Sequence, residues 1–337
     1  MKCINKPKQL VTILLAASIL TTGCTAANHT EALQAYETSI QEESYYTGEF
    51  FANDLAVVSG KTPIVNNLEN SKDTNYKDTD EIYSSILVDT DSGEVLYAKS
   101  ALEKFYPAST TKIVTALVAL EHGKDKLDEI VTVSETAVDL PFDSSICGLS
   151  AGDQLTLRDL ITGLLIKSGN DAANAIAEYI AGSIDGFVDL MNKQAEAVGA
   201  TNSHFMNPHG LHDENHYTTA YDLYLLFQSC IDNEAFMEII KSDTYTTTIT
   251  NINGVQREAT WLTTNQYKRG FVLSPSTVDV VGGKTGFTSA ARNCLVLLST
   301  DLQEDSQNHP YISIIMGANG PKTLYSEMTR LLEEVSS

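Results

Sequence analysis

The hydrophobic pattern predicts β-strands at both ends of a folded region that begins near Glu81. Two β-like runs, 85–89 and 95–98, flank a turn that contains Asp, Ser and Gly, a combination typical of a β-hairpin. Toward the other end of the chain, three apolar runs predict buried strands: 278–281, 295–299 and 311–317.

Between these strands, apolar residues recur at helical spacing. We expect a helix to begin near Lys112 and others over 155–166, 171–181, 190–198, 220–230 and 324–335. Strands at both ends with helices between them predict an α+β fold. Its antiparallel sheet, formed by the N- and C-terminal strands and flanked by helices, would join the two ends of the domain.

The first two dozen residues have the pattern of an export signal. Lys2, Lys6 and Lys8 form a basic start, residues 11–20 are apolar but too few to span a membrane, and small residues follow up to Cys24. We therefore expect residues 1–24 to be a signal peptide.

The end of this signal, Leu20-Thr21-Thr22-Gly23-Cys24, resembles a bacterial lipobox, although Thr21 stands where leucine is common. A lipobox would make Cys24 the lipid-bearing N-terminus and anchor the protein on the outer face of the bacterial cell membrane. The alternative is ordinary cleavage after Ala27, within Thr25-Ala26-Ala27, which would release a soluble secreted protein.

Residues 25–80 are rich in Glu, Asp, Asn, Ser and Thr and contain few large aliphatic residues, which is typical of a solvated linker. We expect this acidic linker to be a flexible tether and one domain to cover residues 81–337. A flexible coil of roughly fifty residues spans on the order of 40 Å.

Charge and cysteine usage exclude several classes of function. The 337 residues carry a net charge of −22, which repels the phosphates of nucleic acids. The cysteines beyond the signal do not suggest a disulfide framework, and Cys230 and Cys294 lie in apolar surroundings, so we expect them to be buried as small hydrophobic side chains. No His/Cys cluster has the spacing of metal ligands, and we expect neither a metal nor another cofactor.

Candidate chemistry begins with Ser109 and Lys112. Because they are three positions apart at the start of a helix, they share one face and the lysine amine can reach the serine hydroxyl. A desolvated lysine beside a second cation can be neutral enough to take the hydroxyl proton, and the helix N-terminus offers N–H groups to an oxyanion. On its own, the pair is weak evidence for a catalytic site, since Ser-x-x-Lys occurs by chance in many helices.

Two further motifs are also ambiguous when each is considered alone. Ser168-Gly169-Asn170 places a hydroxyl and an amide at a break between helices, where a proton could be relayed to a leaving amine or the helix ends could simply be capped. Gly282-Gly283-Lys284-Thr285-Gly286 closes the strand 278–281 and suits a bound carboxylate; the alternative is a β-bulge beside a solvated lysine.

Together, the order of the three motifs resembles that of the penicilloyl-serine enzymes and, among them, the serine-type D-Ala-D-Ala carboxypeptidases, or low-molecular-mass penicillin-binding proteins. The resemblance covers about 85–320 and includes the runs 207–211 and 218–223. It implies a β-lactamase/transpeptidase-like fold in which a mostly helical subdomain accompanies the sheet. It also implies a role in cell wall biogenesis, a peptidoglycan stem peptide ending in D-Ala-D-Ala as substrate, and β-lactam antibiotics as inhibitors.

The resemblance assigns a role to each candidate residue. Ser109 would be the acylated nucleophile and Lys112 its base, with Ser168 as proton relay and Asn170 as the positioner of that relay. The N–H groups of Ser109 and Phe287 would form the oxyanion hole. Substrate binding is expected at Lys284, Thr285, Gly286 and Phe287, with the terminal carboxylate on the lysine and threonine. His209 is expected to serve packing or loop structure only.

Two rival functions remain. A class A β-lactamase would show Ser-Asp-Asn and a Glu-x-x-Leu-Asn loop, whereas this chain has Ser168-Gly169-Asn170 and lacks that loop. A non-catalytic penicillin-binding sensor or lipoprotein would be acylated without turnover. Many members of the resembled family add a β-rich domain and an anchoring helix, and because this chain ends one helix after Gly317 we expect the lipid on Cys24 to be its anchor.

Overall fold

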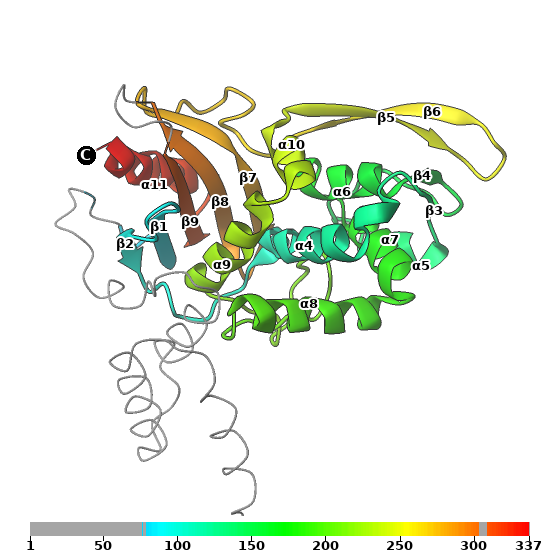
Figure 1. The fold of residues 1–337 in the computed structure, drawn as a ribbon, viewed down its shortest axis with the longest axis horizontal. Helices are drawn as coiled ribbons and strands as arrows, with labels where there is room; N and C mark the ends of the chain where they lie inside the picture. Colours follow the sequence, from blue (N-terminus) through cyan, green and yellow to red (C-terminus); the bar gives the residue numbers. More distant parts are fainter. Residues whose placement is uncertain (1–75, 77–78, 303–308, 337) are drawn as a thin grey trace, which may run out of the picture. The chain divides into compact units, whose positions relative to one another are not determined.

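The computed structural model describes Tyr76, residues 79–302 and residues 309–336 (Figure 1). The expected signal peptide with Cys24, and nearly all of the expected linker, lie outside the described residues. Among the residues that are described, no helix is both long enough and apolar enough to cross a bilayer.

A five-stranded antiparallel sheet joins the two ends of the domain, which confirms the predicted α+β fold. Its strand order is β2-β1-β9-β8-β7. The strands are β1 (Ser84–Asp89), β2 (Val95–Lys99), β7 (Val278–Thr288), β8 (Arg292–Asp301) and β9 (Pro310–Ala318). The pairing of β1 with β9, in which Ser84 lies opposite Met316, attaches the N-terminal hairpin to the C-terminal strands.

Alternate side chains of the sheet enter two different cores. In β1, Ile86 and Val88 belong to the core shared with most of the helices, whereas Leu87 belongs to the core under α11 (Pro321–Glu333). Helix α11 packs against β8 and β9 on that second face (Figure 1). Both faces of the sheet are therefore covered.

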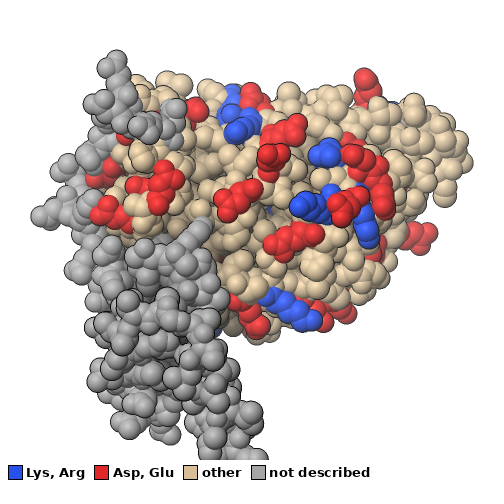
Figure 2. Space-filling model, viewed as in Figure 1, with Lys and Arg blue, Asp and Glu red and all other residues tan. Residues whose placement is uncertain are grey.

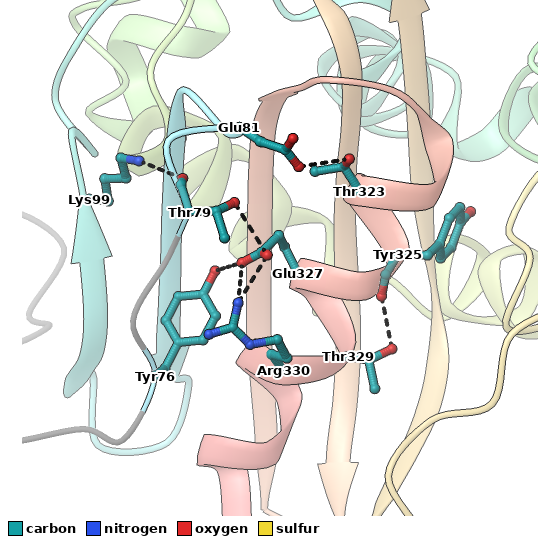
Figure 3. Close-up of polar contacts among 9 residues, drawn as sticks. All are labelled: Tyr76, Thr79, Glu81, Lys99, Thr323, Tyr325, Glu327, Thr329 and Arg330. Atoms are coloured by element: carbon teal, nitrogen blue, oxygen red, sulfur yellow. Dashed lines mark hydrogen bonds and ion pairs between the residues drawn. The ribbon is translucent and has the colours of Figure 1, made fainter.

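Helix α11 also holds the start of the described chain (Figure 3). The Tyr76 hydroxyl donates to Glu327 Oε2 at 3.0 Å, and the Thr79 hydroxyl donates to Glu327 Oε1 at 3.3 Å. Arg330 bonds both oxygens of the same carboxylate, and the ring of Tyr76 packs edge-on against Tyr97 of β2. Tyr76, which the sequence pattern assigns to the linker, is thus packed into the domain.

The other face of the sheet is covered by helices around α4 (Lys112–His122). Every residue of α4 from Lys112 to Leu120 is buried, because other helices surround it. These are α6 (Leu157–Ile166), α7 (Asn170–Ala181), α8 (Ile184–Val198) and α9 (Ala220–Ile231). Helix α9 also packs against β1 and β9, so it connects this helical layer to the sheet.

Several elements were not predicted. A second antiparallel sheet has the order β3-β4-β5-β6 and consists of β3 (Ile130–Thr132), β4 (Gln154–Thr156), β5 (Thr244–Thr250) and β6 (Gln256–Leu262). The short helix α5 (Glu135–Val138) and α10 (Glu234–Lys241) were missed too. Strand β5 reads Thr-Tyr-Thr-Thr-Thr-Ile-Thr, and because only Ile249 is fully buried, it lacks a clear hydrophobic alternation.

Two boundaries differ from the prediction by more than three residues. Helix α8 begins at Ile184 rather than near residue 190, because the Ser183 side chain accepts the N–H of Gly186 and caps the helix there. Strand β7 continues to Thr288, so the glycine-rich motif lies inside the strand instead of closing it. The register of β7 against β8 shifts between Val280 and Gly282, which is the β-bulge that the sequence left open.

Candidate active site

The candidate nucleophile lies in a strained turn immediately before α4. The 3-10 turn Ala108–Thr111 opens on Ala108, whose φ of 48° is in the left-handed region that costs a non-glycine residue about 1–2 kcal/mol. Side chains fix the turn, because Thr110 Oγ1 donates to Pro107 O at 2.7 Å and Thr111 Oγ1 donates to Ala108 O at 2.8 Å. Ser109 follows the strained residue and lines the adjacent cleft.

Lys112, the candidate base, is completely buried next to Ser109. Its amine contacts Ser109 Oγ at 3.1 Å, Asn170 Oδ1 at 2.7 Å and the backbone oxygen of His209 at 2.6 Å. Burial lowers the pKa of Lys112 well below its usual value, and the charge of Lys284 lowers it further. In the neutral amine, the two carbonyl oxygens can take both N–H groups, which leaves the nitrogen lone pair for the Ser109 hydroxyl.

The second motif, Ser168-Gly169-Asn170, contacts both Lys112 and Lys284. Ser168 has a φ of 65° in the break between α6 and α7, and the Asn170 N–H that follows donates to Ser145 O at 2.8 Å. Lys284 Nζ donates to Ser168 Oγ at 2.9 Å. Both lysines are therefore in contact with the second motif, Lys112 through Asn170 and Lys284 through Ser168.

Strand β7 brings Gly286 against the nucleophile turn. It is the edge strand of the sheet, and a Cβ on Gly286 would lie 2.9 Å from Pro107 O and 3.1 Å from Ser109 N. Only glycine allows this approach. The backbones that carry Ser109 and Phe287, the expected oxyanion-hole residues, are consequently side by side.

Lys284 and Thr285 differ in exposure and partners. Lys284 is 1% exposed, and burial lowers its pKa to about 7. A bound carboxylate would raise that pKa. The Thr285 hydroxyl shares a hydrogen bond of 2.6 Å with the Thr264 hydroxyl, which also faces the cleft.

A cleft of about 660 Å³ unites the three motifs. Its walls include Ser109, Ser168, Asn170, Thr285, Gly286 and Phe287, while the two lysines lie buried behind them. Such a cleft, with two buried amines and several hydroxyls converging on one serine, suits attack on a carbonyl carbon of a substrate that ends in a carboxylate.

Some features of the site were missed by sequence reasoning. The His209 side chain was expected to be structural, but the backbone oxygen of this residue is a partner of Lys112, and backbone partners leave no signal in residue type. Thr264 lies in a loop that carries no motif. Asp171 accepts the N–H groups of Cys147 and Leu149 and so fixes the loop beside the second motif.

The predictions for Cys230 and Cys294 are confirmed. Both thiols are fully buried, and burial raises the pKa of each. Cys147 is a third free, buried cysteine, and none of the three is in a disulfide. These thiols are therefore protonated at neutral pH and act as packing groups.

Comparison with curated proteins shows similarity to carboxypeptidases. The chain is 34% identical over 261 residues to D-alanyl-D-alanine carboxypeptidase DacF of Bacillus subtilis, covering 75% of this chain and 61% of DacF. It is 36% identical over 254 residues to D-alanyl-D-alanine carboxypeptidase DacC of Escherichia coli, covering 73% of this chain and 59% of DacC. The chain thus spans about three fifths of the length of these relatives.

Solved structures show the same fold. The crystal structure of a Streptomyces DD-transpeptidase matches with a TM-score of 0.70 at 28% identity, covering 77% of this chain and 99% of that one. A D-alanyl-D-alanine carboxypeptidase from Mycobacterium tuberculosis matches with a TM-score of 0.67 at 27% identity, covering 78% and 94%. The model of the family Peptidase_S11, D-alanyl-D-alanine carboxypeptidase, matches residues 72–320, and the chain belongs to this family.

Proposed function

We propose that this protein is a serine-type D-Ala-D-Ala carboxypeptidase that removes the terminal D-Ala from peptidoglycan pentapeptide stems in cell wall biogenesis. The geometry of Lys112 carries the proposal, because a buried amine with a lowered pKa touches Ser109 Oγ while carbonyl oxygens occupy its other positions. The family and its named relatives support the substrate class.

In the acylation step, Ser109 Oγ attacks the carbonyl carbon of the penultimate D-Ala, and neutral Lys112 takes the hydroxyl proton. The N–H groups of Ser109 and Phe287 stabilise the oxyanion. As the C–N bond breaks, a proton passes by way of the Ser168 hydroxyl to the leaving nitrogen, and the terminal D-Ala departs. Lys284 and Thr285 hold the carboxylate of that residue.

In the second step, water attacks the ester carbon and gives its proton to the base. The Ser109–carbon bond then breaks, and Ser109 recovers its hydroxyl proton, which leaves the shortened peptide as product. A β-lactam acylates the same oxygen when its ring opens. Because its amine stays attached to the acyl group, the ester persists, which accounts for inhibition.

Release of D-Ala from a pentapeptide mimic tests the proposal. Ser109→Ala should abolish D-Ala release, because no other group supplies the attacking oxygen. Ser145→Ala is the matched control: Ser145 also lines the cleft, but its hydroxyl donates to Lys167 O, so release should persist. Parent protein that binds penicillin without releasing D-Ala would support a sensor instead.

We also propose that Cys24 carries lipid and that the protein works outside the cytoplasm, on the outer face of the cell membrane. The basic start, the apolar run and the lipobox-like Gly23-Cys24 support export and acylation. Residues 25–75 have the composition of an acidic, solvated linker. Such a linker would let the domain reach the cell wall from the membrane. Cleavage after Ala27 is the alternative, with a secreted protein as its result.

A further inference from the structure

The segment 204–216 contacts both the nucleophile turn and helix α4. Pro208 O accepts the hydroxyl of Thr115 at 2.6 Å, and the next carbonyl, His209 O, accepts the amine of Lys112. Gly210, with a φ of 85°, lies so close that an added Cβ would be 1.9 Å from Ala108 O. From the sequence, His209 in this segment was expected to serve only packing or loop structure, yet the segment supports both the base and the strained residue before the nucleophile.

The far end of the segment adds a buried histidine to this support. His216 is 2% exposed, and its Nε2 lies 2.7 Å from the hydroxyl of Thr111. Its Nδ1 accepts the N–H of Met206 at 3.1 Å. Nδ1 therefore bears no proton, so the hydrogen of the neutral ring is on Nε2.

The direction of each hydrogen bond follows from this tautomer. The Thr111 hydroxyl donates its single proton to Ala108 O at 2.8 Å, so Thr111 Oγ1 must accept from His216 Nε2–H. Burial lowers the pKa of His216 to about 3, which keeps the ring neutral across the physiological range. The chain of donors runs in one direction, from the Met206 N–H to the Ala108 carbonyl.

We propose that His216 is a positioning residue for acylation. Through Thr111 it holds the Ala108 carbonyl, and thereby the left-handed backbone of Ala108, in the orientation that places Ser109 over Lys112. Gly210 packs on the same carbonyl, so that oxygen is fixed by contact with Gly210 and by the Thr111 hydrogen bond. This inference rests on the proposed role of Ser109 and extends it to residues that do not touch substrate.

A double-mutant cycle tests the proposal. His216→Leu and Thr111→Val each remove one link without adding bulk, and we expect each to lower the rate of acylation by penicillin about 10- to 100-fold, since small misplacements of a reacting group cost that much. KM for a D-Ala-D-Ala peptide should stay near the parent value, because carboxylate capture is untouched. The double variant should be no slower than the slower single variant, because both substitutions break one chain.

Conservative variants separate positioning from general stability. His216→Gln offers an amide that can accept from the Met206 N–H and donate to Thr111, and Thr111→Ser retains the hydroxyl, so both should recover most of the rate. His204→Leu is the matched control, because His204 lies in the same segment but bonds Asn215 O instead of the nucleophile turn. Its acylation rate should equal that of the parent.

The outcomes decide between distinct failures. Circular dichroism first checks that the variants are folded. If folded Thr111→Val acylates as fast as Thr111→Ser, His216 does not position the nucleophile. If the decreases in acylation rate of the two single variants multiply in the double variant, His216 and Thr111 do not act through one hydrogen-bond chain, and the proposal fails. Acylation of the Ser109→Ala protein would instead refute the proposed function and leave the hydrogen-bond chain without a nucleophile to position.

Discussion

The two buried lysines of the candidate site have different surroundings, and the proposed mechanism gives them different tasks. Lys112 contacts a hydroxyl and two carbonyl oxygens, and both burial and Lys284 lower its pKa. Lys284 contacts the hydroxyl of Ser168 and Thr285 O, and burial lowers its pKa to about 7. In the proposed mechanism, the first takes the proton of Ser109 and the second holds the substrate carboxylate.

Removal of Lys284 should move the pH profile of acylation. The neutral fraction of Lys112 increases as pH rises through its pKa, and Lys284→Gln removes a cation that lowers this pKa. We therefore expect the rising limb of acylation by a carboxylate-bearing penicillin to shift to higher pH. The overall rate should also fall, because the carboxylate loses its cationic partner.

Acylation rates across a pH series check this expectation. Lys167→Gln is the control, since Lys167 is an exposed lysine next to Ser168 and is not among the groups that shift the pKa of Lys112 or Lys284. Its profile should overlie that of the parent. A Lys284→Gln profile with an unmoved rising limb would show that Lys284 is not coupled to the base.

Among individual residues, the sequence indicated which side chains would come together in one site but not which contacts position them. Ser109, Lys112, Ser168, Asn170 and Lys284 come together as their motifs suggested. The backbone oxygen of each residue looks the same in a sequence, so its contact with Lys112 could not be foreseen. The same holds for the left-handed alanine, because strain at a functional turn opposes local propensity.

At the scale of elements, the approach of β7 to the nucleophile turn decides whether the site forms. A Cβ at position 286 would lie 2.9–3.1 Å from backbone atoms of Pro107, Ser109 and Thr110. Backbone atoms cannot turn aside as a flexible side chain can. We expect Gly286→Ala to separate the strand from the turn and to slow acylation about 100-fold or more.

Stability measurements make this prediction specific to the site. Gly254→Ala is the control, because its φ of 75° makes the substitution strained, by about 1 kcal/mol, while no atom lies within 4 Å of the new Cβ. That variant should lose stability but acylate normally. Normal acylation by Gly286→Ala would contradict the close approach.

Helix α11 gives a second test at this scale, away from the cleft. Tyr76→Phe keeps the ring that packs on Tyr97 but removes the hydrogen bond to Glu327 Oε2. We expect the free energy of unfolding to fall by about 1 kcal/mol. A denaturant titration measures the loss, and acylation of the folded variant should stay unchanged. An unaltered midpoint would mean that this contact adds nothing to the domain.

Elements with a clear hydrophobic period were predictable, and those without one were not. The N-terminal hairpin, the three C-terminal strands and the helices that cover the sheet all bury apolar runs. Strands β5 and β6 instead expose most of their side chains and pair mainly with each other. Their stability comes from backbone pairing and cross-strand contacts, which a hydrophobic pattern does not reveal.

The overall charge of the protein bears on the proposed substrate. The net charge of −22 would repel an anionic stem peptide at long range, and acidic side chains are spread over the face shown in Figure 2 with basic ones among them. Lys284 is 1% exposed, so its attraction acts only inside the cleft. The proposed lipid anchor would offset this repulsion, because it would hold the domain close to the cell wall and so raise the local concentration of the proposed substrate.

The proposed anchor is testable by cell fractionation. Cys24→Ser removes the thiol that would carry lipid, and we expect it to move the protein from the membrane fraction to the medium. Cys3→Ser is the control, because it changes a cysteine of the same signal outside the lipobox-like run. Unchanged membrane association of Cys24→Ser, or a mature N-terminus at Asn28, would contradict lipidation.

The proposed mechanism requires that one serine forms a covalent acyl-enzyme that turns over. Mass spectrometry of a digest made soon after mixing with penicillin shows which residue is acylated. We predict that the mass of the penicillin is added to the peptide containing 108–112, on Ser109, and that the same preparation releases D-Ala from a D-Ala-D-Ala peptide until penicillin is added. An adduct on another residue, or D-Ala release that continues after Ser109 is fully acylated, would contradict the account.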